Sequence, residues 1–162
     1  NTNLAAAGGV VTALILCQIL YKKVDLTFVL NGALGGLVSI TAEPLAPTFI
    51  SAVLIGGIGG ALVVFTVPLL DKLKIDDVVG AIPVHLVCGI WGTLAVPLTN
   101  SDAKFSIQLI GILSIGAFVL ISSFILWYAV KAILGVRLSD EEEKDGADKT
   151  EIGLNSYPEF IK

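Results

Sequence analysis

The sequence is poor in the residues on which metal sites, disulfide frameworks and soluble surfaces depend. Its 162 residues include no methionine, one histidine and two cysteines, and only 15% of them are charged. Soluble domains carry about 25% charged residues, so the deficit indicates a membrane protein. One histidine argues against a histidine-based zinc site, and two cysteines are too few for a disulfide framework or a cysteine metal site. The lack of a basic patch argues against nucleic-acid binding.

The beginning of the chain also lacks a recognisable targeting segment. It reads Asn1-Thr2-Asn3-Leu4, without the basic region that opens a signal peptide. Together with the absence of methionine, this beginning leads us to expect a fragment or processed piece of a longer protein.

What the sequence does contain is a long apolar body followed by an acidic tail. The mean hydropathy is +0.90. Residues 136–162 hold eight acidic and four basic residues, a net charge of −4, whereas residues 1–135 hold six of each sign and are neutral. We therefore expect a membrane domain over 1–135 and a cytoplasmic tail over 136–162. The tail could be passively solvated or could dock on the cytoplasmic face, and Tyr157 and Phe160 mildly favour docking.

Continuous apolar runs of nearly membrane-spanning length fill the body. A transmembrane helix needs about 20 mostly apolar residues. Five runs qualify, although the second is short: residues 4–21, 26–41, 49–70, 78–98 and 107–134. The sequence therefore predicts an all-α integral membrane protein with five transmembrane helices.

The charges between these runs predict an orientation. Lysines and an arginine follow the first, third and fifth runs at Lys22, Lys72 and Arg137, whereas loops 42–47 and 99–104 hold one base between them. The positive-inside rule places the basic ends in the cytoplasm. With five spans, the N-terminal end is then outside and the C-terminal tail is cytoplasmic.

The single histidine, His85, lies inside the fourth apolar run. Ala81, His85 and Gly89 are four residues apart, with Gly92 three further on, and we expect them to share one helix face lined by small residues. An ionisable residue inside a membrane is a functional hypothesis by default, with a lumen or a closely packed neighbour as its surroundings. The alternative is a buried structural histidine that is hydrogen-bonded to another helix. No acid lies near enough for a catalytic triad, so an enzyme is not expected.

Polar and small residues around this run have simpler interpretations. Asp76 and Asp77 precede it and can cap the free N–H groups of the helix, while Pro83 near its start removes a hydrogen bond and can kink it. Small residues also recur every fourth position at Gly32 and Gly36, and along the stripe Ala52, Gly56 and Gly60. This spacing is typical of helices whose backbones pack closely.

Several stretches, in their order and spacing, resemble the Amt branch of the ammonium transporter (Amt/MEP/Rh) superfamily. They are Asn1-Thr2 with Ala5-Ala6-Ala7, Leu30 to Ala42, Ile75 to Thr93, Gln108 to Gly111, and Gly135 to Leu138. The resemblance covers nearly the whole chain. It corresponds to helices seven to eleven of an eleven-helix fold and the tail that follows them.

The resemblance implies transport of ammonium or ammonia through a hydrophobic pore. His85 matches the second member of the family's pair of pore histidines, and Asp77, Ala81 and Gly89 have supporting places on or near the same helix. The partner histidine and the outer recruitment site belong to a half that this chain lacks, so the piece alone should not conduct. An ammonium sensor or interaction protein on the same scaffold is the alternative.

The resemblance also implies an assembly and a location. It implies a homotrimer with one pore per protomer, in contact with lipid in the inner or plasma membrane, with a PII-type regulator as a possible cytoplasmic partner and no cofactor. Arg137, Gly146 and Asp148 are the expected tail and subunit contacts, although the family's Gly-Leu-Asp…His-Gly-Glu run reads Gly-Ala-Asp…Ile-Gly-Leu here. Val78 and Leu86 replace residues that are commonly Pro and Gly in the family, and Leu86 adds bulk beside His85.

Overall fold

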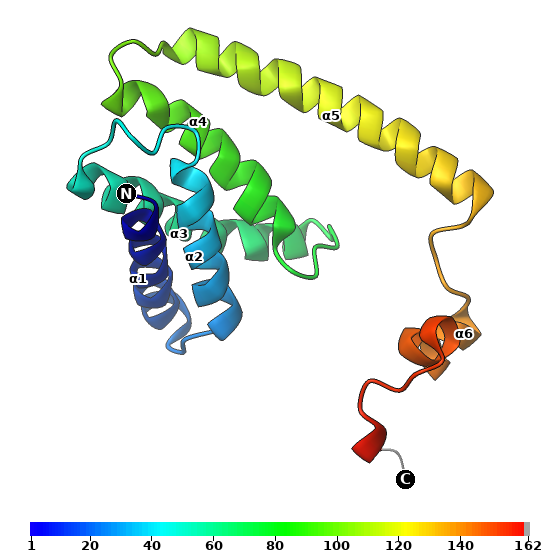
Figure 1. Ribbon diagram of the computed structural model, residues 1–162. Helices are drawn as coiled ribbons and strands as arrows, with labels where there is room; N and C mark the ends of the chain where they lie inside the picture. The colour runs from blue at the N-terminus through cyan, green and yellow to red at the C-terminus, as the bar shows by residue number, and fades with distance from the viewer. Residues whose placement is uncertain (161–162) are drawn as a thin grey trace. The chain divides into compact units, whose positions relative to one another are not determined.

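Helices are the only regular secondary structure in residues 1–160, the part of the chain that the computed structural model describes (Figure 1). The apolar elements are α1 (Thr2–Tyr21), α2 (Leu26–Ile40), α3 (Phe49–Lys72), the π-helix η1 (Ile82–Val87) continued by α4 (Cys88–Thr99), and α5 (Phe105–Ile133). Four spans are long and apolar enough to cross a membrane, counting η1 and α4 as one, and α2 is a shorter apolar helix of 15 residues. The predicted all-α membrane fold is confirmed.

Two compact units divide the chain, Asn1–Ile115 and Gly116–Lys162, and α5 runs across their boundary. The first unit contains α1 to α4, in which α1, α2 and α3 contact one another and α4 contacts α2 and α3. The second contains the remainder of α5 and the tail elements α6 (Asp140–Asp145), η2 (Asp148–Ile152) and η3 (Pro158–Phe160).

Glycines let α1, α2 and α3 pack backbone against backbone. A Cβ atom built on Gly36 of α2 or on Gly56 of α3 would overlap the carbonyl oxygen of Ala5 in α1, and one on Gly60 would overlap that of Gly9. The predicted close packing of these small residues is therefore confirmed. In a membrane, where lipid is as apolar as a leucine side chain, such close contact supplies much of the attraction between helices.

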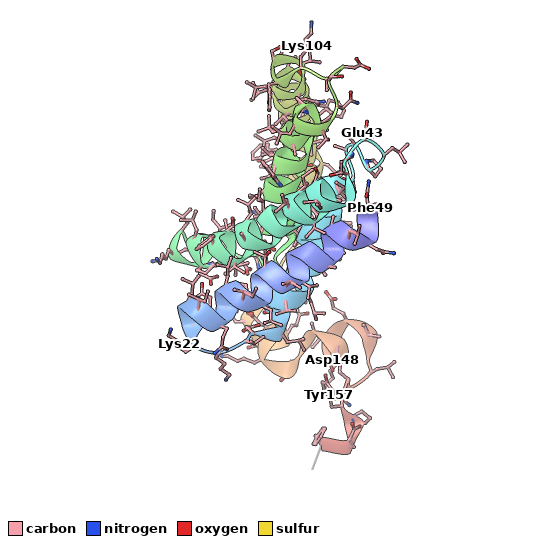
Figure 2. All side chains as sticks on the ribbon, turned by 90° about the vertical axis from the view of Figure 1, so that its left-hand side faces the viewer. Lys22, Glu43, Phe49, Lys104, Asp148 and Tyr157 are labelled. Carbon is pink, nitrogen blue, oxygen red and sulfur yellow. The ribbon has the colours of Figure 1, made fainter. Side chains whose placement is uncertain are left out.

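The loops alternate between two ends of this bundle. Figure 2 shows Glu43 and Phe49 near one end and Lys22 at the other. Asn1 lies at the Glu43 end, where its Nδ2 donates hydrogen bonds to the carbonyl oxygens of Pro44 (2.9 Å) and Pro47 (2.7 Å). Asn100 of the α4–α5 loop lies at the same end and donates to a carboxylate oxygen of Glu43 over 3.3 Å.

At the Lys22 end, α2 begins with a side-chain cap. Asp25 Oδ1 accepts hydrogen bonds from the amides of Thr27 (2.8 Å) and Phe28 (3.4 Å). Two hydrogen bonds from Thr27 lower the pKa of this carboxyl group, and the bond from the hydroxyl has a larger effect than the bond from the amide. The cap fixes where α2 starts after the short turn from α1.

The fourth span begins later than the sequence predicted. Helical structure starts at Ala81 and not at Val78. Residues 78–79 form a turn, and Gly80 takes the left-handed backbone angle φ of +78°. A residue with a Cβ atom adopts that conformation only at a cost, so glycine is suited to the position. The apolar character of Val78 and Val79 concealed the turn.

The tail has local structure of its own. Ser139 and Glu142 form a capping box at the start of α6, in which each side chain binds the other residue's backbone amide. Hydrogen bonds from Ser139 hold the pKa of the Glu142 carboxyl below its usual value, and the bond from the amide has a larger effect than the bond from the hydroxyl. The described tail residues are mostly exposed, and the helix ends at Gly146 with φ of +98°.

Candidate functional site

His85 lies in the middle of the π-helix η1, with its side chain exposed. The residue before it, Val84, is 1% exposed, and the residue after it, Leu86, is 56% exposed. The helix therefore buries one side against α2 and α3 and presents His85 on the other. π-helical turns are rare and are frequently found at functional sites.

Small residues flank the imidazole, in part as predicted. Ala81 is exposed one turn before His85. Gly89 follows it, and a Cβ atom built there would meet only Val38, at 3.9 Å. This open face consists of Ala81, His85 and Gly89. None of the hydrogen bonds found among residues 1–160 involves the imidazole.

Gly92 does not belong to this open face, contrary to the sequence prediction. It is buried, and a Cβ atom there would lie 2.6 Å from the carbonyl oxygen of Ser39 in α2. In a regular α-helix, residues seven apart differ in direction by only about 20°, so His85 and Gly92 would share a face. The π-helical turn over Ile82–Val87 breaks this spacing, and Gly92 lies on the packed side.

Asp77 fixes the beginning of the His85 helix. Its two carboxylate oxygens accept hydrogen bonds of 2.8 Å from the amides of Ala81 and Ile82. The predicted capping role is confirmed for Asp77, whereas Asp76 is exposed. A carboxylate in this place satisfies two amides that have no partner within the helix and also complements the helix dipole.

A hollow of about 290 Å³ lies beside this cap. Asn31 of α2, Asp77 and Gly80 are among its lining residues. The side-chain amide of Asn31 donates to the carbonyl oxygen of Val79 over 3.0 Å and so ties the turn to α2. Sequence reasoning assigned Asn31 no role of its own, although an amide side chain within an apolar run was a signal.

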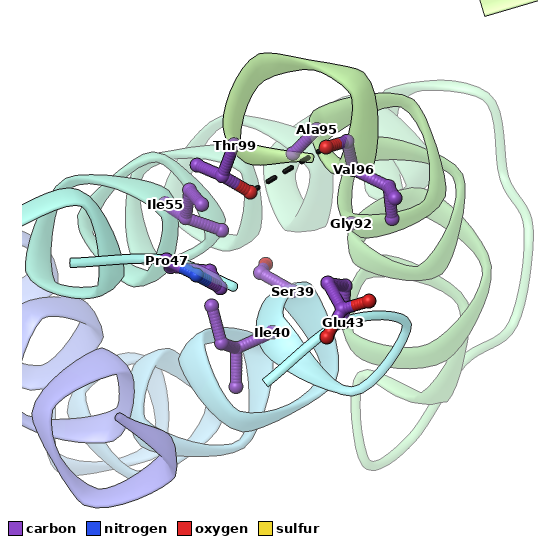
Figure 3. Close-up of a pocket in the computed structure, with 9 residues that line it drawn as sticks. All are labelled: Ser39, Ile40, Glu43, Pro47, Ile55, Gly92, Ala95, Val96 and Thr99. Atoms are coloured by element: carbon purple, nitrogen blue, oxygen red, sulfur yellow. Dashed lines mark hydrogen bonds between the residues drawn. The ribbon is translucent and has the colours of Figure 1, made fainter. Parts of the chain in front are cut away.

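The packed side of the His85 helix contacts α3 through two hydrogen bonds. The thiol of Cys88 donates to the carbonyl oxygen of Gly59 over 3.4 Å, and the indole Nε1 of Trp91 donates to that of Ile55 over 3.0 Å. Figure 3 shows Ile55, Ser39 and Gly92 around the recess where α4 faces α2 and α3. The acceptors are backbone carbonyl groups 29 and 36 residues away from Cys88 and Trp91 in the sequence, and no sequence motif predicts them.

The expected tail contacts lie in the second unit. Gly146 and Asp148 are brought together, since a Cβ atom on Gly146 would lie 2.7 Å from a carboxylate oxygen of Asp148. Asp148 Oδ2 accepts a hydrogen bond of 2.7 Å from the amide of Ser156, and this contact lowers the pKa of the carboxyl group. Arg137 is exposed ahead of α6. Within residues 1–160, no group of three or more His, Cys, Asp or Glu side chains could hold a metal ion.

Comparison with known proteins places this arrangement in a family. The profile of the Ammonium Transporter Family matches residues 1–157. The chain belongs to the ammonium transporter family. The chain is 36% identical to the Ammonium transporter Amt2 of Archaeoglobus fulgidus over 181 residues, and 43% identical over 157 residues to a candidate ammonium transporter of Synechocystis. A solved structure named Sensor Amt Protein superposes with a TM-score of 0.85 at 33% identity.

These ammonium transporter relatives are longer than this chain. The comparisons cover 99% of the chain and 39% of the Archaeoglobus protein, and 94% of the chain and 36% of the Synechocystis protein. The Sensor Amt Protein structure covers 91% of the chain, which covers 40% of it in turn. The chain therefore spans less than half the length of each relative.

Proposed function

We propose that this chain is the C-terminal part of an ammonium transporter, in which His85 lines a hydrophobic pore for ammonia. The observation that carries the proposal is the open face of η1 and α4, where an imidazole stands exposed between Ala81 and Gly89 with no hydrogen bond from residues 1–160. Family membership supports ammonium as the substrate.

The chemistry of the open face suits ammonia better than the ammonium ion. A charge is costly in apolar surroundings, so ammonium must lose its proton to enter a hydrophobic lumen. A neutral imidazole carries one donor nitrogen and one acceptor nitrogen. His85 can therefore accept a hydrogen bond from ammonia or donate one to it, in a place where little else is polar.

The proposal extends to the assembled protein. A second histidine and the outer recruitment site come from the portion of the relatives that this chain does not match, and protomers associate as a homotrimer. The Lys22 end of the bundle faces the cytoplasm of the cell, as the positive-inside rule predicts. The tail is then cytoplasmic, where Arg137, Gly146 and Asp148 contact a neighbouring subunit and a PII-type regulator can bind.

A substitution of His85 in the full-length protein tests the pore role. We expect His85→Ala to lower methylammonium uptake about tenfold or more in cells without other ammonium transporters, equivalent to about 1.4 kcal/mol. Leu86→Ala is the control, because it removes an adjacent exposed side chain without removing a ring nitrogen. It should leave uptake at or above the wild-type rate. Unchanged uptake by His85→Ala in intact trimers would exclude the pore role.

Ammonium sensing is the second candidate function. It is favoured by the similarity to the structure named Sensor Amt Protein, which extends over 91% of this chain. A sensor would bind ammonium without carrying it across the membrane. Ammonium binding to purified protein, combined with uptake no greater than in cells with an empty vector, would favour sensing over transport.

A further inference from the structure

The side of the His85 helix that faces away from the open face is fastened to α3 at two points. Cys88 and Trp91 lie on consecutive turns, and so do the carbonyl groups that accept their hydrogen bonds, Gly59 and Ile55. The contacts therefore form two rungs between the same pair of helices. The first rung lies three residues after His85.

Both rungs are short because the helices approach closely. Cys88 is 0% exposed and packs with Val63 and Val84. Gly92 rests against the Ser39 backbone, where any side chain would collide with it. An indole N–H that loses its partner in such apolar surroundings is costly, so the helix resists turning away from Ile55.

The π-helical turn makes such fastening necessary. Its hydrogen bonds run from residue i to i+5 and do not set side-chain directions in the regular α-helical pattern. A rotation of about 20° would move a group some 6 Å from the helix axis by about 2 Å. A displacement of that size is enough to move an imidazole out of hydrogen-bonding distance of a small substrate.

We propose that Trp91 and Cys88 are positioning residues that fix the rotation of the η1–α4 helix and so hold His85 toward the open face. The rungs act through the helix, since neither side chain is on the face that presents the imidazole. The functional part of this inference rests on the proposed pore role of His85. The structural part, the direction of the imidazole, can be tested independently of transport.

Two substitutions in the full-length protein remove one rung each, and the chain offers a matched control for both. Trp91→Phe removes the indole N–H and keeps an aromatic ring, and Trp127→Phe makes the same change on α5 at an exposed residue. Cys88→Ala removes the thiol, and Cys17→Ala makes the same change at a residue that is equally buried but packs with Ala13 and Val64. Cys88→Ser restores a hydrogen-bond donor.

We expect Trp91→Phe and Cys88→Ala to lower the maximum rate of methylammonium uptake between about two- and tenfold, the range for one lost hydrogen bond. The KM should change little because entry from outside is unaffected, and the amount of trimer should match the controls. Cys88→Ser should recover part of the rate. Rates equal to those of the controls, or a loss explained by less trimer, would overturn the inference.

Cryo-electron microscopy of Trp91→Phe protein separates this inference from the pore role. We expect the imidazole of His85 to be displaced relative to wild type, whereas the Trp127→Phe protein should keep it in place. An unmoved imidazole would overturn the positioning role, whatever the transport rate. If His85→Ala transports normally but the imidazole moves in Trp91→Phe, the proposed pore role fails and the positioning role stands.

Discussion

At the scale of single residues, Asp77 does most to define the start of the candidate pore helix. Each of its carboxylate oxygens accepts one backbone amide, at Ala81 and Ile82, so its removal leaves two donors without these partners. The neighbouring Asp76 carries the same charge and is exposed. The pair therefore separates the contribution of hydrogen bonding from that of charge near the helix dipole.

We predict that Asp77→Ala destabilises the purified protein by about 1–2 kcal/mol, the usual cost of a lost N-terminal cap. Asp77→Asn should be intermediate, because its amide keeps one acceptor oxygen. Thermal unfolding in detergent measures the effect, with Asp76→Ala as the control that removes a charge and no cap. Equal losses in the two alanine variants would mean that charge, and not the hydrogen bonds, matters at this helix end.

Residues also show where prediction from sequence succeeds and fails. The cap at Asp77 was predictable because its partners are only four and five residues away. The partners of Trp91 and Cys88 were not, since they are carbonyl groups 36 and 29 residues away on α3. Gly92 was misplaced because the prediction put three small residues and His85 on one face by regular α-helical spacing, which the π-helical turn does not maintain.

At the scale of elements, apolar length alone located the four candidate membrane spans and the shorter apolar helix α2. The run predicted at 49–70 corresponds to α3 at Phe49–Lys72, and the run at 107–134 corresponds to α5 at Phe105–Ile133. The boundary that failed was the start of the fourth span. There the backbone angle of Gly80 decides the matter, and hydropathy does not report backbone angles.

The contact between α1 and α3 yields a prediction at this scale. Gly56→Ala would push a methyl group into the Ala5 carbonyl, so we expect destabilisation of about 1–3 kcal/mol from overpacking. Gly111→Ala on α5 is the control, since a Cβ atom there meets nothing within 4 Å and alanine favours a helix. Thermal unfolding should therefore show a lower midpoint for Gly56→Ala and an unchanged or higher one for Gly111→Ala.

An unfolding midpoint that Gly56→Ala leaves unchanged would indicate that α1 and α3 can separate slightly at no cost. That result would contradict the backbone packing inferred from Gly36, Gly56 and Gly60. The decrease in the unfolding midpoint therefore measures how rigidly the bundle of α1, α2 and α3 supports the helix that carries His85.

At the scale of the whole molecule, the function proposed for these 162 residues depends on the open face of Ala81, His85 and Gly89. Sites near the membrane midplane in transporters with inverted repeats form between two halves of the protein. The chain spans 39% of its Archaeoglobus relative, and His85 is exposed on the open face. In the proposed function, that face forms one side of such an interface. A pore needs a second wall to keep lipid away from the imidazole.

We predict that residues 1–162, expressed alone in cells without other ammonium transporters, insert into the membrane but give no methylammonium uptake above an empty vector. The full-length protein should restore uptake in the same cells, with membrane fractionation to compare the amounts of both. Uptake by the short chain that His85→Ala abolishes would contradict the prediction. It would mean that copies of this chain enclose a conducting path by facing one another, because only then could a single wall be used twice.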